Sequence, residues 1–100
     1  MLQKVFKYPV PTTDTFTILM PKDAQILTVQ VQNPTTGAVC MWVLVDVDVP
    51  QEFRHFRLVG TGYPILESII KYIGTFQVND GQLVFHLFEI VKENANANHS

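Results

Sequence analysis

Cysteine is nearly absent from this chain. Cys40 is the one cysteine among 100 residues, so an intramolecular disulfide is excluded. It lies within an apolar run, where a thiol packs as a small hydrophobic side chain in a protein of a reducing compartment. The three histidines are scattered along the sequence. We therefore expect neither a metal site nor another cofactor.

Charged residues are also few, at 16% of the chain against about 25% in an average globular protein. The seven basic residues are scattered and the net charge is −2, which argues against binding of a nucleic-acid polymer. So little charge on a small domain leaves much of its surface apolar. Two explanations stay open, a homo-oligomer that covers this surface and a sparsely charged monomer with a dense core, and we favour the homo-oligomer.

Long hydrophobic runs are missing as well, because no apolar stretch reaches the ~18–20 residues that cross a bilayer. Residues 1–4 lead directly into an alternating pattern, without the features of a signal peptide. We expect no membrane contact and a cytosolic location.

What the chain has in abundance is a period of two, which is typical of β-strands. Proline, glycine and short polar residues separate the alternating segments. The expected strands cover residues 3–9, 14–20, 25–33, 38–47, 52–60, 72–79 and 82–91. The one helix candidate is a short turn at 65–70, and so short a helix is marginal without tertiary support.

The third and fourth expected strands differ in pattern. The third alternates, which predicts that Leu27, Val29 and Val31 face the core. The fourth, residues 38–47, is apolar on both faces, as expected for a strand covered on two sides by the fold or by another subunit. A four-residue loop between the two strands predicts that Val29 lies opposite Trp42.

The last two strands carry the strongest local signal. Asp80-Gly81 between two alternating segments is typical of a two-residue type I′ hairpin, in which both turn residues take positive φ. This register predicts three cross-strand pairs, which are Phe76 with Phe85, Val78 with Leu83, and Thr75 with His86.

Together these features predict an all-β fold, a compact antiparallel sandwich or small barrel of about seven strands. We expect one β domain over residues 1–92. Residues 93–100 lack an apolar period and are expected to form a disordered tail.

Few residues have the chemistry to bind a ligand. Arginine binds phosphate or carboxylate with two parallel hydrogen bonds, and a glycine turn can direct backbone N–H groups at an anion. The predicted ligand-binding residues are Arg54, His55, Arg57, Gly60, Thr61, Gly62, Tyr63 and His86.

Each of these residues also has a structural interpretation. The arginines can pair with Glu52 or Asp48, and the glycine turn can simply relieve the end of a strand. His86 lies on an apolar side of its strand, where it can hydrogen-bond Thr75 or serve as a donor on the floor of a pocket. Ser68 and Ser100 are the only serines, Ser100 lies in the expected tail, and Cys40 is expected to be buried, so we expect no catalytic residues and no enzyme.

Five segments, which are residues 29–33, 42–46, 60–65, 72–76 and 83–89, together resemble a family of short uncharacterised proteins encoded by tailed bacteriophages and prophages. The resemblance covers residues 4–89. The family often carries histidine where Tyr63 stands here. The resemblance implies a setting in the bacterial host cytosol or the virion, and it makes accessory or counter-defence roles the expectation.

From these observations we expect a non-enzymatic binding protein. The first hypothesis is a homo-oligomeric sponge that sequesters a small anionic, nucleotide-like immune signal. The alternative is a protein-interaction module that inhibits a host protein or serves in virion assembly.

Overall fold

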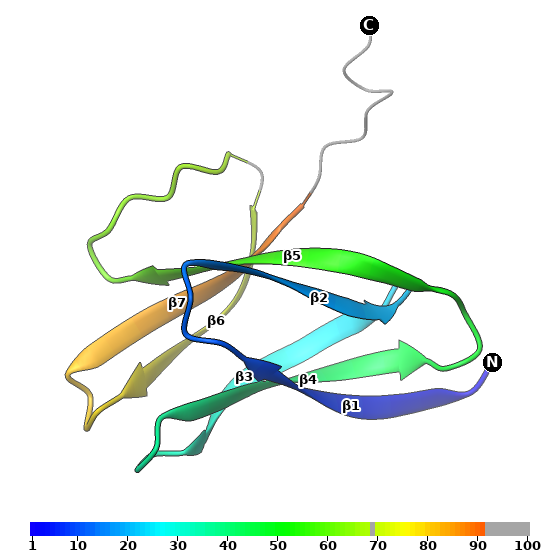
Figure 1. Cartoon of the computed structure of the whole chain (residues 1–100), viewed down its shortest axis with the longest axis horizontal. Coiled ribbons are helices and arrows are strands. Elements are labelled where there is room, and N and C mark those ends of the chain that lie inside the picture. Colours follow the sequence, from blue (N-terminus) through cyan, green and yellow to red (C-terminus); the bar gives the residue numbers. More distant parts are fainter. Residues whose placement is uncertain (69, 92–100) are drawn as a thin grey trace, which may run out of the picture.

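A computed structural model describes residues 1–68 and 70–91 and shows seven strands (Figure 1). The predicted helical turn at 65–70 is not formed over residues 65–68, and residue 69 lies outside the described residues, as do residue 92 and the predicted tail at 93–100. No helix within the described part has the length and apolar character of a membrane span. The strands are β1 (Gln3–Val10), β2 (Thr15–Pro21), β3 (Gln25–Asn33), β4 (Ala38–Asp46), β5 (Gln51–Gly60), β6 (Ile70–Val78) and β7 (Leu83–Ile90).

The strands form two antiparallel sheets, which confirms the all-β prediction. One sheet has the order β1-β4-β3 and the other has the order β2-β5-β7-β6. The sheets lie against each other at the edge strands β3 and β6, whereas β1 and β2 on the opposite side do not pair (Figure 1). The fold is therefore a sandwich that is closed along one side and open along the other, and it is not a closed barrel.

The core lies between the two sheets and is supplied by alternate residues of each strand. β4 contributes every second side chain to it, and Phe56 stacks on Phe16 with ring centroids 5.1 Å apart. Burial of such apolar surface is the main stabilising term of the fold. The fully buried side chains of greatest volume are Phe56, Met20, Met41, Leu87, Val43 and Val45.

The second apolar face of β4 lies on the outside of the three-stranded sheet. β4 is the central strand, so both of its edges are occupied within the chain. On the outer face Trp42 is half-buried, and its indole N–H donates to Gln30 Oε1 at 2.8 Å. Lys7 Nζ donates to Gln32 Oε1 at 2.9 Å across the same face. Long polar side chains of the neighbouring strands thus lie over much of the face that the sequence predicted to be covered.

The register of β3 differs from the prediction. An irregularity between Ile26 and Thr28 places Leu27 at the surface, so the prediction that Leu27 faces the core is wrong. Val29 lies opposite Met41 instead of Trp42. The bulge beside Leu27 inserts one residue, so Ile26 before it and Val29 and Val31 after it all pack against the core, and the prediction for the two valines is confirmed. The change of partner for Val29 comes from a second irregularity, between Val31 and Asn33.

The predicted pairing of the last hairpin is confirmed. All three predicted pairs are present, Phe76 with Phe85, Val78 with Leu83, and Thr75 with His86. Asp80 and Gly81 have φ angles of 55° and 83°, and Gln82 N donates to Asn79 O at 3.0 Å, which agrees with the predicted type I′ turn. Asn79 also has a positive φ of 55°, and the strands end at Val78 and Leu83, so the loop spans residues 79–82 instead of two residues.

Gly74 lies where the two sheets approach each other, at the contact between β6 and β3. It follows an irregularity in β6, between Tyr72 and Gly74, and lies against β3. A Cβ at this position would lie 2.6 Å from Cγ1 of Val29, closer than any real contact of this kind. Only glycine lets the two edge strands approach to this distance.

We expect Gly74→Ala to destabilise the protein by about 1–3 kcal/mol, because a methyl group there overpacks the contact with Val29. Urea denaturation measures this loss. Val29→Ala removes the opposing methyl groups, so the double variant should lose less stability than the sum of the two single variants. Additive losses would contradict the close approach of β3 and β6.

Candidate functional site

The predicted ligand-binding residues do not form one cluster. Alternation along β5 places Arg54 on the inner face of its sheet, whereas His55 and Arg57 lie on the outer face. His86 also lies on the outer face, on β7, opposite Val59. Residues 60–63 end β5 and begin the connection that runs to β6. Arg54 is thus separated from the other predicted residues by the sheet itself.

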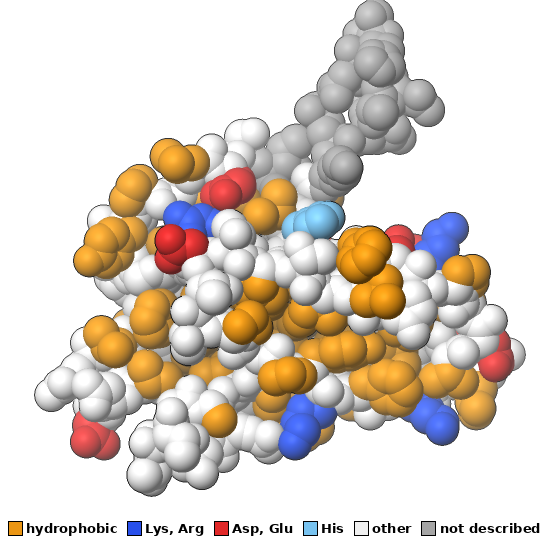
Figure 2. Space-filling model, in the orientation of Figure 1, with side chains coloured by type: hydrophobic (Ala, Val, Ile, Leu, Met, Phe, Trp, Pro, Cys, Tyr) orange, Lys and Arg blue, Asp and Glu red, His pale blue; other side chains and the backbone are white. Residues whose placement is uncertain are grey.

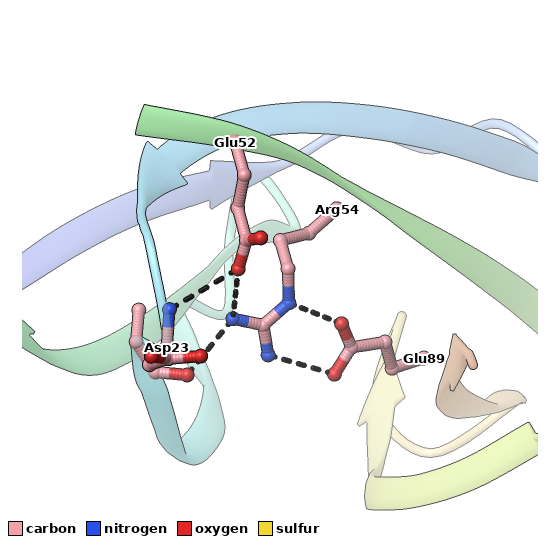
Figure 3. Close-up of polar contacts among 5 residues, drawn as sticks. Asp23, Glu52, Arg54 and Glu89 are labelled. Carbon is pink, nitrogen blue, oxygen red and sulfur yellow. Dashed lines mark hydrogen bonds and ion pairs between the residues drawn. The ribbon is translucent and has the colours of Figure 1, made fainter. Parts of the chain in front are cut away.

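Arg54 forms a largely buried ion pair with Glu89 of β7 (Figure 3). Its Nε donates to Glu89 Oε2, its Nη2 donates to Glu89 Oε1 at 2.9 Å, and its Nη1 donates to the Ala24 carbonyl at 2.9 Å. The hydrogen bonds that the Arg54 guanidinium donates to Glu89 raise its pKa further above its usual range. All these donors of Arg54 are directed at acceptors of the chain, so Arg54 holds β5, β7 and the Ala24 carbonyl together. We call these contacts of Arg54 the clamp.

The clamp extends to the turn between β2 and β3. Glu52 Oε2 lies 3.9 Å from Arg54 Nη1 and accepts a hydrogen bond from the Asp23 backbone N–H at 3.1 Å (Figure 3). This turn carries the chain from one sheet to the other. The sequence interpretation missed Glu89. Its position could have revealed it, because alternation along the strand places this acidic residue on the same apolar face as Phe85 and Leu87.

Arg57 holds the connection at 61–68 against the outer face of the four-stranded sheet. Its Nε donates to Glu67 Oε1 at 3.2 Å, and its Nη2 donates to the Pro64 carbonyl at 3.4 Å. Its Nη1 donates to the carbonyls of Asp14 and Leu58, each at 3.1 Å. This guanidinium is therefore also occupied by acceptors of the protein.

The turn at residues 60–63 uses its own backbone donors. Tyr63 N donates to Gly60 O at 3.1 Å, and Gly62 has a φ of 90°, which is the arrangement of a type II turn with glycine in its third position. Thr61 N donates to Val84 O at 3.2 Å. A backbone nest for an anion requires unpaired N–H groups. The geometry therefore favours a turn that ends a strand over an anion-binding loop.

His86 lies within a chain of side-chain hydrogen bonds on the outer face. Its Nε2 is 2.7 Å from Thr61 Oγ1 and its Nδ1 is 2.9 Å from Thr75 Oγ1, and Thr75 Oγ1 is 2.6 Å from the Tyr72 hydroxyl. The contact with Thr75 matches the structural interpretation of His86, although the imidazole is half-buried outside the core. His55 Nδ1 is 3.0 Å from Thr17 Oγ1.

Neither histidine forms an ion pair within residues 1–68 and 70–91. Nucleophilic catalysis with a histidine base usually requires a carboxylate that orients the imidazole beside the nucleophile. In the same part of the chain no three histidine, cysteine, aspartate or glutamate side chains are grouped as metal ligands would be.

Two adjoining hollows lie at the end of the sandwich where the connections at 11–14, 34–37, 61–68 and 79–82 meet. The larger has a volume of about 610 Å³, with a floor that includes Val39, Leu58 and Phe76 and a rim that includes Thr35 and Asp80. The smaller has a volume of about 420 Å³ and contains three predicted residues, Arg57, Gly60 and Tyr63. The two hollows share Thr12, Leu58 and Phe85.

Three exposed apolar side chains stand around these hollows, and we call Tyr63, Leu66 and Leu83 the loop-end triad. Their exposed fractions are 73%, 84% and 49%. Tyr63 and Leu66 line the smaller hollow, and Leu83 lines the larger one. The sequence interpretation found Tyr63 and missed the two leucines. Leu66 and Leu83 could have been found because each is an apolar residue close to a predicted turn.

The chain belongs to the family described as Domain of unknown function (DUF7352), whose model matches residues 1–98. No curated protein and no solved structure matches the chain.

We expect Glu89→Ala to cost about 3 kcal/mol of stability, because it leaves the largely buried Arg54 without its partner. Guanidinium denaturation measures the loss. The double variant Arg54→Met/Glu89→Leu removes both charges and should be more stable than Glu89→Ala alone.

The control is Glu67→Ala, which removes the partner of Arg57 at a more exposed site and should cost no more than about 1 kcal/mol. Equal losses for Glu89→Ala and Glu67→Ala would contradict a clamp at Arg54.

Proposed function

We propose that this chain is a non-enzymatic protein-interaction module that binds a partner protein through its loop end. The observation that carries the proposal is the loop-end triad around two adjoining hollows. Large exposed apolar side chains beside a concave surface are typical of interfaces, where a few buried anchors supply most of the affinity.

The chemistry of the hollows supports a neutral or apolar anchor from the partner. The rim of the larger hollow combines hydroxyl and amide groups with Asp80, and no arginine, lysine or histidine of the described residues lines it. Arg57 is the one basic residue at the smaller hollow, and its donors are directed at carbonyls and at Glu67. An anionic, nucleotide-like ligand would meet little free positive charge here.

The alternative is the sponge for a small anionic immune signal that the predicted residues favoured. Of the predicted residues, Arg54 lies on the inner face of the sheet, away from His55 and Arg57, and is bound to Glu89. The backbone N–H groups of Thr61 and Tyr63 are bound to carbonyls. The resemblance to phage-encoded proteins is equally compatible with a host protein and a virion protein as the partner. It supports the bacterial cytosol as the place of interaction.

We expect the triple variant Tyr63→Ala/Leu66→Ala/Leu83→Ala to lose its partner. Quantitative affinity purification from phage-infected cells compares this variant with the wild-type chain and with Val5→Ala/Leu27→Ala, which truncates exposed apolar side chains of β1 and β3. Removal of interface anchors costs about 2 kcal/mol or more at each hot spot, so enrichment should fall at least about tenfold for the triple variant. A partner that binds all three chains equally would contradict the proposed surface.

Isothermal titration with cyclic and ADP-ribose-type nucleotides separates the two hypotheses. We expect no binding at micromolar concentrations, because neither arginine is free to pair with a phosphate. Micromolar binding that Arg57→Gln abolishes and Leu66→Ala leaves unchanged would restore the sponge.

A further inference from the structure

Four strands stand at the edges of the two sheets, and edge strands carry unpaired backbone groups that can join another chain. Two of these edges, β3 and β6, lie against each other, and each contains an irregularity that interrupts its pairing. The other two, β1 and β2, are left on the open side of the sandwich (Figure 1). A band of hydrophobic side chains lies across the middle of this side, between β2 and β1 (Figure 2).

β1 and β2 differ in the residues that protect an edge. β1 contains Lys4, Lys7 and Pro9, and lysine and proline on an edge strand discourage the addition of another strand. β2 is Thr-Phe-Thr-Ile-Leu-Met-Pro, which contains no charged residue and has proline at its last position alone. Its side chains are β-branched, aromatic or aliphatic at nearly every position, as in paired strands. β2 is therefore the one open edge without a protecting residue along its length.

The register shows which backbone groups of β2 are available. Leu58 N donates to Asp14 O and Lys22 N donates to Pro50 O, so the even-numbered residues of β2 exchange hydrogen bonds with β5. In an antiparallel pair the alternate residues direct their N–H and C=O groups away from the partner. Thr17 and Leu19 thus present two donors and two acceptors at the free edge.

An exposed apolar pair lies on the outer face beside this edge, next to the polar pair of Thr17 and His55. Leu19 lies opposite Phe53 of β5, and their exposed fractions are 47% and 66%. Phe53 is the most exposed large hydrophobic residue within any strand. A second copy placed antiparallel along β2 would continue the four-stranded sheet and would bring the two Leu19–Phe53 pairs onto one continuous surface.

We infer that β2 is the edge through which two copies of this chain associate, with Thr17 and Leu19 of each copy forming the backbone hydrogen bonds. A second copy fits because an antiparallel two-fold pairing matches each edge with an identical, uncharged one. The interface is distinct from the loop-end triad and shares no residue with it. It also differs from the outer face of β4, for which the sequence left open a cover from the fold or from another subunit.

Sedimentation velocity between about 1 and 100 µM tests the inference on the full chain. We expect the wild-type chain to sediment as a dimer at the upper end of this range. Thr17→Lys/Leu19→Lys places like charges at the two-fold pairing and should raise the dimer Kd at least about 100-fold. The matched control Val5→Lys/Leu27→Lys changes two exposed side chains of β1 and β3 and should leave the dimer Kd unchanged.

Hydrogen exchange of the wild-type chain gives a second measurement that needs no substitution. The amides of Thr17 and Leu19 should be protected at high concentration and should lose this protection on dilution. A wild-type monomer at about 100 µM, a dimer that persists in Thr17→Lys/Leu19→Lys, or exchange at these amides that does not change with concentration would each overturn the inference.

Discussion

The buried ion pair between Arg54 and Glu89 is the interaction on which the arrangement of the two sheets depends. It joins β5 to β7 and, through the Ala24 carbonyl, to the turn at which the chain leaves one sheet and enters the other. Separation of a buried pair costs several kcal/mol, so this crossing point is held in one geometry. β3 can then lie against β6, where Gly74 allows the close approach, and the opposite side stays open.

The scarcity of charge limits the kind of partner that the loop end and the β2 edge can bind. Both arginines are used inside the chain, Arg54 between the sheets and Arg57 beneath the connection to β6. The partner binding that we propose at the loop end would therefore depend on shape and apolar contact, and the self-association that we infer at β2 would depend on backbone hydrogen bonds. Neither surface needs a cation, which accords with a chain that has seven basic residues in all.

Much of the fold could be predicted because the period of two is a local property. The type I′ turn fixes the register of β6 and β7 without help from the rest of the chain, so the pairs around Asp80-Gly81 were predictable in detail. The register of β3 was not, because its irregularities beside Leu27 and between Val31 and Asn33 have no local sequence signal of their own. For the site, the sequence identified residues with the chemistry to bind an anion. It could not show whether the partner of an arginine is a ligand or a carboxylate of the chain such as Glu89.

An all-β chain, the alternation that directs side chains inward or outward, and the pairing of the last two strands follow from the amino-acid sequence. Each of these depends on neighbouring residues alone, through strand periodicity and the conformational range of glycine and proline. Only the tertiary structure shows which faces are covered, that both arginines are bound within the chain, and which edges stay unpaired. Those properties depend on contacts between residues far apart in the chain, such as Arg54 with Glu89 and Val29 with Gly74.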